Sequence, residues 1–302
     1  QALVALVFGG VVFFQAGRMF FSKKLGRGNF AVWASLLFLG ALTLRLFLGF
    51  YTEGYTADMD TFKSWAYLTN TVGFQEIYHQ DIFLDYPPGY LYVLAFLDKI
   101  RQGLGIAMEA QLYTLMIKLP SIFADLFCAG VLLLLAQRKM GDLWALFLAG
   151  VYLFCPAVFL NSAQWGQADS FCTAILLGSV LFFYREKYVP AAALLGFSIA
   201  CKPQMLVFVP LYLFVSLKRG HWLKLILGVV VTMGTVLLVA LPFTQGFDFL
   251  WLFQRYQATL DYYSYYSVNA YNFWSLIGWN WKQLPSGVAG KLWDFVGPII
   301  AT

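Results

Sequence analysis

The segment QLYTLMIKLPSIFADLFCAGVLLLLA, residues 111–136, decides the fold class. Its charged side chains are Lys118 and Asp125, and it exceeds the about 20 apolar residues that a helix needs to cross a bilayer. The 302-residue chain is 61% hydrophobic and 12% charged, with a mean hydropathy of +0.70, whereas soluble domains are roughly 45–50% apolar. We therefore predict an all-α polytopic membrane protein.

Similar apolar runs recur along the chain, without the alternating pattern of membrane strands. They cover residues 2–16, 29–50, 143–160, 168–184, 189–200, 204–216 and 223–243, and another begins near 288. The chain starts with Gln1 and stops while this last run is opening. We therefore expect residues 1–302 to be a single transmembrane catalytic module that is truncated at its C terminus.

The basic residues gather in short loops between these runs, and they set an orientation through the positive-inside rule. The clusters are Arg18 to Arg27, Arg138 with Lys139, Arg185 with Lys187, and Lys218 to Lys224. All four can be cytoplasmic on two conditions. Residues 89–103 must not cross completely, and the runs 189–200 and 204–216 must be short helices broken at CKPQ, residues 201–204, where proline removes a backbone donor.

This orientation places two long loops, residues 51–88 and 244–287, on the outer face. We expect the chemistry there, in a protein integral to a bacterial inner membrane with the bilayer as its partner. The net charge of +5 is explained by the cytoplasmic loops, so we exclude a nucleic-acid partner.

The stretch YTADMDTFKSWA, residues 55–66, holds two acids, Asp58 and Asp60, in front of an apolar stripe with helical spacing. The stripe consists of Phe62, Trp65, Ala66, Thr69 and Val72, and it predicts a helix that lies in the membrane interface. The acids could cap this helix, for which one carboxylate is enough. The alternative is that at least one is chemical, because ionisable groups beside a membrane-embedded site are functional candidates.

Other polar motifs fall on the same predicted face. Tyr86 belongs to DYPPGYLY, and Trp165, Gln167 and Asp169 belong to NSAQWGQADS. Aromatic anchoring or helix capping would account for each, but amides beside a tryptophan also make a sugar-binding surface.

The break at CKPQ carries Lys202 and Gln204, and the second outer loop carries Arg255 and the segment YYSYYSVNAYNFW, residues 262–274. Lys202 could simply snorkel to the interface, or it could grip a phosphate. The aromatic loop is too long for a bare connector, which indicates a functional segment.

Six motifs in this order resemble the GT-C superfamily of membrane glycosyltransferases, and most closely the bacterial relatives of GPI mannosyltransferase II. They are DMDTFKSWA, DYPPGYLY, KLPSIFAD, NSAQWGQADS, KPQ and SVNAYNFW, between residues 58 and 274. The resemblance implies inverting glycosyl transfer from a polyprenyl-phosphate sugar, with mannose as the expected sugar. The acceptor would be a glycan, a lipid or a protein.

The resemblance implies that Asp58 is the acceptor-activating base and that Asp60 is the second carboxylate of a D-x-D-like pair. The candidates for substrate binding are Tyr86, Trp165, Gln167, Asp169, Lys202, Gln204, Arg255, Asn269 and Asn272. A phosphate leaving group needs no general acid, in contrast to glycoside hydrolysis. We expect no required cofactor and no metal ligand, and a divalent ion between Asp58 and Asp60 is the alternative.

Two other functions remain open. A transporter or flippase would also use a broken helix such as the one at CKPQ, but it should carry charges in the middle of several spans. A non-catalytic scaffold would not require the Asp58 carboxylate.

Overall fold

The computed structural model describes residues 27–262, 265–268 and 273–283. The chain divides into two compact units, residues 1–243 and residues 244–302. The predicted runs 2–16 and 288 onward lie outside the described residues. The predicted all-α fold class is confirmed. The division falls where the second outer loop was predicted to start.

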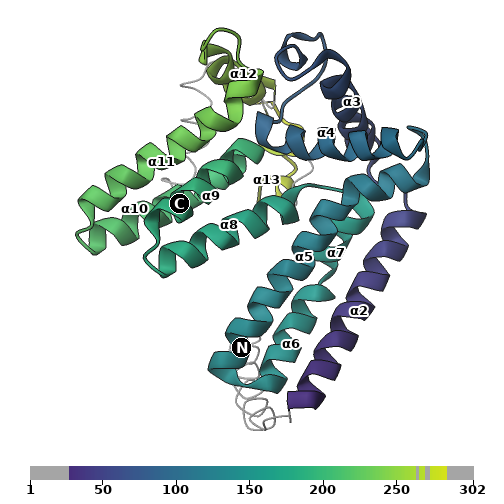
Figure 1. Ribbon diagram of the computed structural model, residues 1–302, viewed down its shortest axis with the longest axis vertical. Coiled ribbons are helices and arrows are strands. Elements are labelled where there is room, and N and C mark those ends of the chain that lie inside the picture. Colours follow the sequence, from purple (N-terminus) through teal and green to yellow (C-terminus); the bar gives the residue numbers. More distant parts are fainter. Residues whose placement is uncertain (1–26, 263–264, 269–272, 284–302) are drawn as a thin grey trace. The chain divides into compact units, whose positions relative to one another are not determined.

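The first unit is a succession of helices joined by short turns (Figure 1). Its elements are α2 (Arg27–Tyr51), α3 (Thr56–Val72), η1 (Ile77–His79), α4 (Pro88–Gly103), α5 (Gln111–Met140), α6 (Asp142–Leu153), α7 (Pro156–Phe159), η2 (Leu160–Trp165), α8 (Asp169–Tyr184), α9 (Tyr188–Cys201), η3 (Pro203–Phe208), α10 (Val209–Lys218), α11 (Trp222–Ala240) and η4 (Leu241–Phe243). In the second unit, the described elements are α12 (Leu250–Tyr262) and α13 (Phe273–Leu276).

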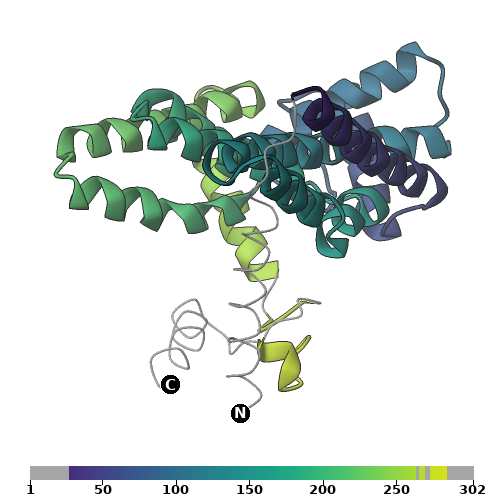
Figure 2. The ribbon, with the colours of Figure 1, turned by 90° about the horizontal axis from the view of Figure 1, so that it is seen from below.

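The long apolar helices of the first unit form two groups. Helices α2, α5 and α6 pack side by side, and α9 packs between α8 and α11 in the second group (Figure 1). Contacts between α5 and α8 join the groups. Figure 2 shows the same unit after a quarter turn, with the α8–α11 helices extending away from α2.

Among the described residues, three helices are long and apolar enough to cross a membrane: Gly28–Tyr51, Gln111–Met140 and Trp222–Phe243. A fourth candidate is the pair Asp142–Leu153 and Pro156–Trp165, which is bent by 49°. The sequence predicted a single run over 143–160. The helix breaks there because Pro156 has no backbone N–H to continue the hydrogen-bond ladder.

The predicted break at CKPQ is confirmed. Helix α9 ends at Cys201, Lys202 has an extended backbone with φ −153° and ψ 120°, and η3 begins at Pro203. Antiparallel packing of α8 and α9 places this break beside the start of α8. The break therefore brings Lys202 to the same end of the bundle as Asp169.

Helix α4 is not among the helices long and apolar enough to cross a membrane. The predicted orientation requires this, because residues 89–103 must not cross the membrane completely. It packs on α3, and its last turns carry a buried polar cluster. Asp98 is fully buried and accepts hydrogen bonds from Asn70, Arg101, Gln102 and Tyr113. Helices α3 and α4 therefore form a packed layer of their own beside the spanning helices.

The apolar stripe of α3 is confirmed, but its partner differs from the prediction. Phe62, Trp65, Ala66 and Thr69 are buried, and the Trp65 indole donates a 2.7 Å hydrogen bond to the Phe83 carbonyl. The stripe therefore faces protein rather than lipid, because helix α4 and the loop before it cover it.

Candidate functional site

The carboxylate of Asp58 is held by the NSAQWGQADS segment. The indole Nε1 of Trp165 donates a 2.8 Å hydrogen bond to Asp58 Oδ2, and the side-chain amide of Gln167 donates to the same oxygen. Among the described residues, Asp58 Oδ1 has no hydrogen-bond donor, so one oxygen is fixed and the other is available. Asp58 lies in the first turn of α3 and is partly buried.

Neither Asp58 nor Asp60 caps α3. The N-cap is Tyr55, and no side chain makes a capping hydrogen bond there. The structural reading of Asp58 and Asp60 as caps is therefore wrong. The first acid contributes to helix α3 only through its favourable charge near the N terminus, and its hydrogen bonds go to a segment more than a hundred residues away.

Tyr86 connects this carboxylate to the cation at the helix break. Its hydroxyl lies 3.4 Å from Gln167 Oε1, to which it donates, and the ammonium of Lys202 lies 5.5 Å from its ring centroid. Burial, followed by the nearby Asp169 carboxylate, raises the pKa of the Tyr86 phenol well above its usual value. The phenol therefore stays protonated at neutral pH and acts as a donor.

Lys202 is mostly buried and forms an ion pair with Asp169, whose side chain is 45% exposed. Asn161 Nδ2 lies 3.3 Å from the other carboxylate oxygen of Asp169. The lysine thus does not extend away to the interface by itself, as simple snorkelling would require. It forms part of a polar network that runs from Asp58 through Gln167 and Tyr86.

The KLPSIFAD motif on α5 forms hydrogen bonds with the NSAQWGQADS segment, which carries part of this network. Ser121 Oγ donates a 2.7 Å hydrogen bond to the Gln167 carbonyl, and Asp125 accepts one of 2.6 Å from Ser162. Asp125 is also paired with Arg45 of α2, Nε to Oδ2 at 2.9 Å, and both side chains are fully buried. Sequence reasoning missed Arg45, although a charge inside the apolar run 29–50 was a usable signal.

Two glycines allow the close approaches that the network needs. Gly166 has φ +93°, and a Cβ there would lie 2.6 Å from Cε of Met59. Gly89 in the first turn of α4 abuts the end of α9, where a Cβ would lie 2.7 Å from the backbone carbonyl of Ala200. This contact seats the Tyr86 segment beside Lys202.

The structure therefore brings together six predicted site residues: Asp58, Tyr86, Trp165, Gln167, Asp169 and Lys202. Gln204 is exposed on η3 and does not join the network. Arg255 lies on α12 of the second unit. Asn269 and Asn272 lie outside the described residues, so all three of these positions remain predictions.

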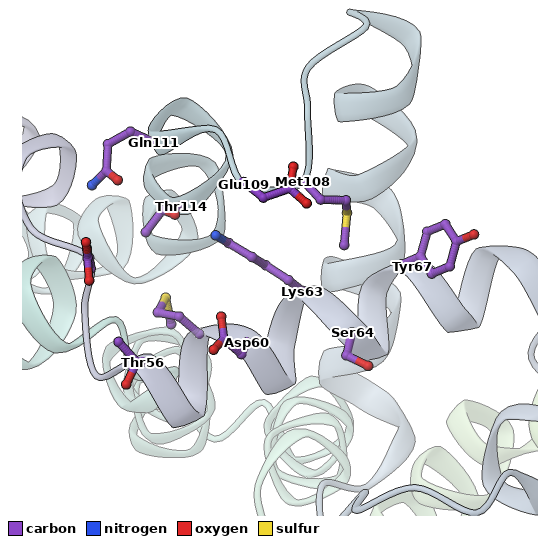
Figure 3. A pocket seen from close by; sticks show the side chains of 11 residues that line it. Thr56, Asp60, Lys63, Ser64, Tyr67, Met108, Glu109, Gln111 and Thr114 are labelled. Carbon is purple, nitrogen blue, oxygen red and sulfur yellow. The ribbon is translucent and has the colours of Figure 1, made fainter.

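Asp60 lies in a different environment from Asp58. It is exposed and lines a cavity with Lys63, Glu109 and other residues of the first unit (Figure 3). Two positions on an α-helix that are separated by two residues point about 200° apart. The described residues contain no group of three or more His, Cys, Asp or Glu side chains placed to hold a metal ion.

The fold and the site define an all-α membrane protein with a polar network of a carboxylate, amides and a paired cation at its helix ends. Residues 83–297 match the family model of glycosyltransferase family 87. The chain belongs to this family, and the predicted glycosyltransferase resemblance is confirmed at this level. The closer likeness to relatives of GPI mannosyltransferase II remains a prediction. Asp58 precedes the matched region, so its role as the base remains a prediction.

A curated relative is the dolichyl pyrophosphate Glc1Man9GlcNAc2 alpha-1,3-glucosyltransferase of Saccharomyces cerevisiae. The two are 26% identical over 218 residues, which is 67% of this chain and 36% of the yeast protein. The chain therefore spans about a third of the length of that relative.

Proposed function

We propose that the protein is an inverting glycosyltransferase that moves a sugar from a polyprenyl-phosphate donor to an acceptor hydroxyl at the outer membrane face. The observation that carries this proposal is the Asp58 carboxylate. Trp165 and Gln167 hold its Oδ2, while Oδ1 accepts no hydrogen bond from the described residues. A carboxylate fixed on one side and open on the other suits a general base.

In this mechanism Asp58 takes the proton of the acceptor hydroxyl. The acceptor oxygen attacks the anomeric carbon from the face opposite the phosphate, and the bond to the phosphate oxygen breaks. The polyprenyl phosphate leaves as a stabilised anion, so no second carboxylate has to supply a proton. Lys202, held between Asp169 and the Tyr86 ring, would offset the charge that develops on the phosphate.

The loops between α8 and α9 and between α10 and α11 support the location of the site on the outer membrane face. Arg219 and Glu186 lie 3.5 Å apart, and the Tyr188 hydroxyl lies 2.9 Å from His221 Nδ1. The loops that carry Arg185, Lys187, Lys218 and Arg219 therefore share one side, opposite to the ends that carry Asp169 and Lys202. The positive-inside rule makes the basic side cytoplasmic, which suits a bacterial inner membrane.

The sugar and the acceptor are the open part of this proposal. Mannose is the sugar expected from the motifs, whereas the name of the yeast relative specifies glucosyl transfer. A donor screen should therefore present polyprenyl-phosphate mannose, glucose and arabinose to the purified protein in lipid nanodiscs, together with membrane extract as the source of acceptor. We expect transfer from one of the two hexose donors.

The variant Asp58→Asn should reduce this transfer by at least about a hundredfold, as loss of a general base does. Asp81→Asn is the matched control, because Asp81 is an exposed aspartate outside the network. Undiminished transfer by Asp58→Asn would remove the assignment of the base. Lys202→Ala should weaken donor binding, and unchanged donor affinity would return Lys202 to a structural role.

The alternative is a transporter or flippase for a lipid-linked substrate. The broken helix at Lys202 is the observation that favours it, because discontinuous helices build transporter sites. The charges at this break are tied to the ends of neighbouring helices, which is more typical of an interfacial enzyme. Movement of a fluorescent polyprenyl-phosphate lipid across vesicles, without sugar transfer, would establish the alternative.

A further inference from the structure

A cavity of about 480 Å³ lies beside α3 (Figure 3). Its lining residues do not include Asp58 or the other members of the network around it. Its walls come from α3 and the loop before it, from the start of α5 and from the loop between α4 and α5. The volume falls within the roughly 300–1,000 Å³ of typical small-molecule sites. The proposed mechanism does not use this cavity, although it carries the second acid of the D-x-D-like pair.

The charges of the cavity exclude the donor phosphate as its ligand. Three carboxylates, those of Glu53, Asp60 and Glu109, line it together with one ammonium, that of Lys63. An excess of carboxylates repels an anion and favours a neutral or cationic group. We therefore expect the lipid phosphate to bind near Lys202. The cavity would bind a different part of the substrates.

The uncharged lining residues suit a sugar. Hydroxyl groups of Ser64, Tyr67 and Thr114 can both donate and accept hydrogen bonds, and carboxylates accept bonds from sugar hydroxyls. Met108 supplies apolar surface for the C–H face of a ring. Hydroxyl donors, charged acceptors and an apolar wall together match a neutral polyhydroxyl ring.

Lys63 of the cavity does not form ion pairs with the described carboxylates around it. Within the part of the chain that the structure describes, neither Asp60 nor Glu109 forms an ion pair with Lys63. Figure 3 shows the Lys63 side chain extending across the cavity toward Thr114. Burial lowers the pKa of Lys63, and the surrounding carboxylates act against this shift. These groups retain hydrogen-bonding capacity for a ligand.

Met59 connects the cavity to the network around Asp58. Its side chain lines the cavity and packs against Gly166, the residue between Trp165 and Gln167. On α3, Met59 also stands between Asp58 and Asp60. Met59 therefore contacts both the cavity and the turn that holds Asp58.

We propose that this cavity binds a neutral sugar unit of the acceptor, adjacent to the unit whose hydroxyl Asp58 activates. The proposal deepens the transferase function and rests on it. It makes the acceptor a glycan, either free or lipid-linked, rather than a bare protein hydroxyl. It also gives Asp60 a role in acceptor binding in place of a shared metal site with Asp58.

The test measures sugar binding without any transfer. Methyl glycosides of mannobiose and glucobiose are added at millimolar concentration to the full chain in nanodiscs, and binding is followed by saturation-transfer NMR. The wild-type protein should bind at least one of them. Asp60→Asn should weaken binding about tenfold, the usual effect of losing a charged hydrogen-bond acceptor, and Ser64→Trp should abolish it by filling the cavity. The matched control Asp81→Asn should bind as the wild type does.

The same titration separates the two proposals. Asp58→Asn should leave disaccharide binding within about twofold of wild type while transfer is lost. Absence of wild-type binding, or binding that survives Ser64→Trp, overturns the acceptor cavity and leaves the donor screen unaffected. Cavity-dependent binding with no transfer from any polyprenyl-phosphate donor would instead contradict the proposed donor class. Ser64 and Asp60 are exposed on α3, and an unchanged thermal transition of each variant would exclude misfolding as the cause.

Discussion

Trp165 and Asp58 are joined by a 2.8 Å hydrogen bond although they are 107 positions apart in the chain. The indole belongs to the π-helical turn η2, which is followed by Gly166 in the left-handed conformation. Such turns are frequent at functional sites. Because Gln167 donates to the same carboxylate oxygen, this turn acts as a clamp that orients the proposed base.

Removing one arm of this clamp should lower turnover more than substrate affinity. We expect Gln167→Ala to reduce kcat about tenfold, because it removes one hydrogen bond to a charged group. Steady-state transfer at varied acceptor concentration separates kcat from KM. Gln164→Ala, at an exposed amide of the same segment, is the control and should behave as wild type. An equal loss in both variants would mean that the clamp has no role in orientation.

A methyl group at Gly89 should separate α4 from α9. Gly89→Ala would place a Cβ 2.7 Å from the Ala200 carbonyl carbon and oxygen, and overpacking of this kind costs about 1–3 kcal/mol. The shift should also move Tyr86 away from Lys202 and weaken donor binding. Gly103→Ala is the control on the same helix, because no atom lies within 4 Å of the added methyl. Thermal unfolding and donor titration of both variants provide the measurement. Equal stability of the two would contradict the close approach.

The buried pair of Arg45 and Asp125 should be sensitive to the loss of one partner. Asp125→Leu leaves the fully buried guanidinium without its counter-ion, and breaking a buried pair in this way costs about 3–5 kcal/mol. The double variant Arg45→Met with Asp125→Leu should recover most of that loss. Chemical unfolding in detergent measures both. A double variant less stable than Asp125→Leu would show that the pair does not act through charge burial.

The polar cluster of α4 should make stability depend on pH in the acidic range. Burial opposes the ionisation of Asp98, but the hydrogen bonds from Asn70, Arg101 and Gln102 together hold its pKa below the usual value. A folded-state pKa below the unfolded value of about 3.9 gives stability that is present above pH 4. This stability is lost as the pH falls through the lower folded value.

Asp98→Asn should therefore flatten the stability curve below pH 4 and lower the transition temperature at pH 7. Thermal unfolding at several pH values is the measurement. Asp81→Asn, which changes an exposed carboxylate, should keep the wild-type curve. If the Asp98→Asn variant loses stability below pH 4 as the wild type does, the pH dependence of stability comes from other carboxylates.

Most of the fold could be predicted from the sequence because helix formation in lipid is a local property. Every backbone polar group in the bilayer core must be satisfied within its own segment, so apolar runs alone located α2, α5, α8, α9 and α11. The break before Pro203 followed from proline chemistry. The bend at Pro156 follows from the same chemistry but was missed, because a continuous apolar run covered it.

The sequence by itself determined the fold class, the positions of most apolar helices among the described residues and six of the residues that meet in the network. Only the tertiary structure decided how they meet: that Asp58 pairs with Trp165 and Gln167, that Arg45 neutralises Asp125, and that Asp60 faces a separate cavity. The physical reason is that these contacts join segments distant in the chain. Helical periodicity fixes the face on which a side chain lies, but packing between helices decides what covers that face.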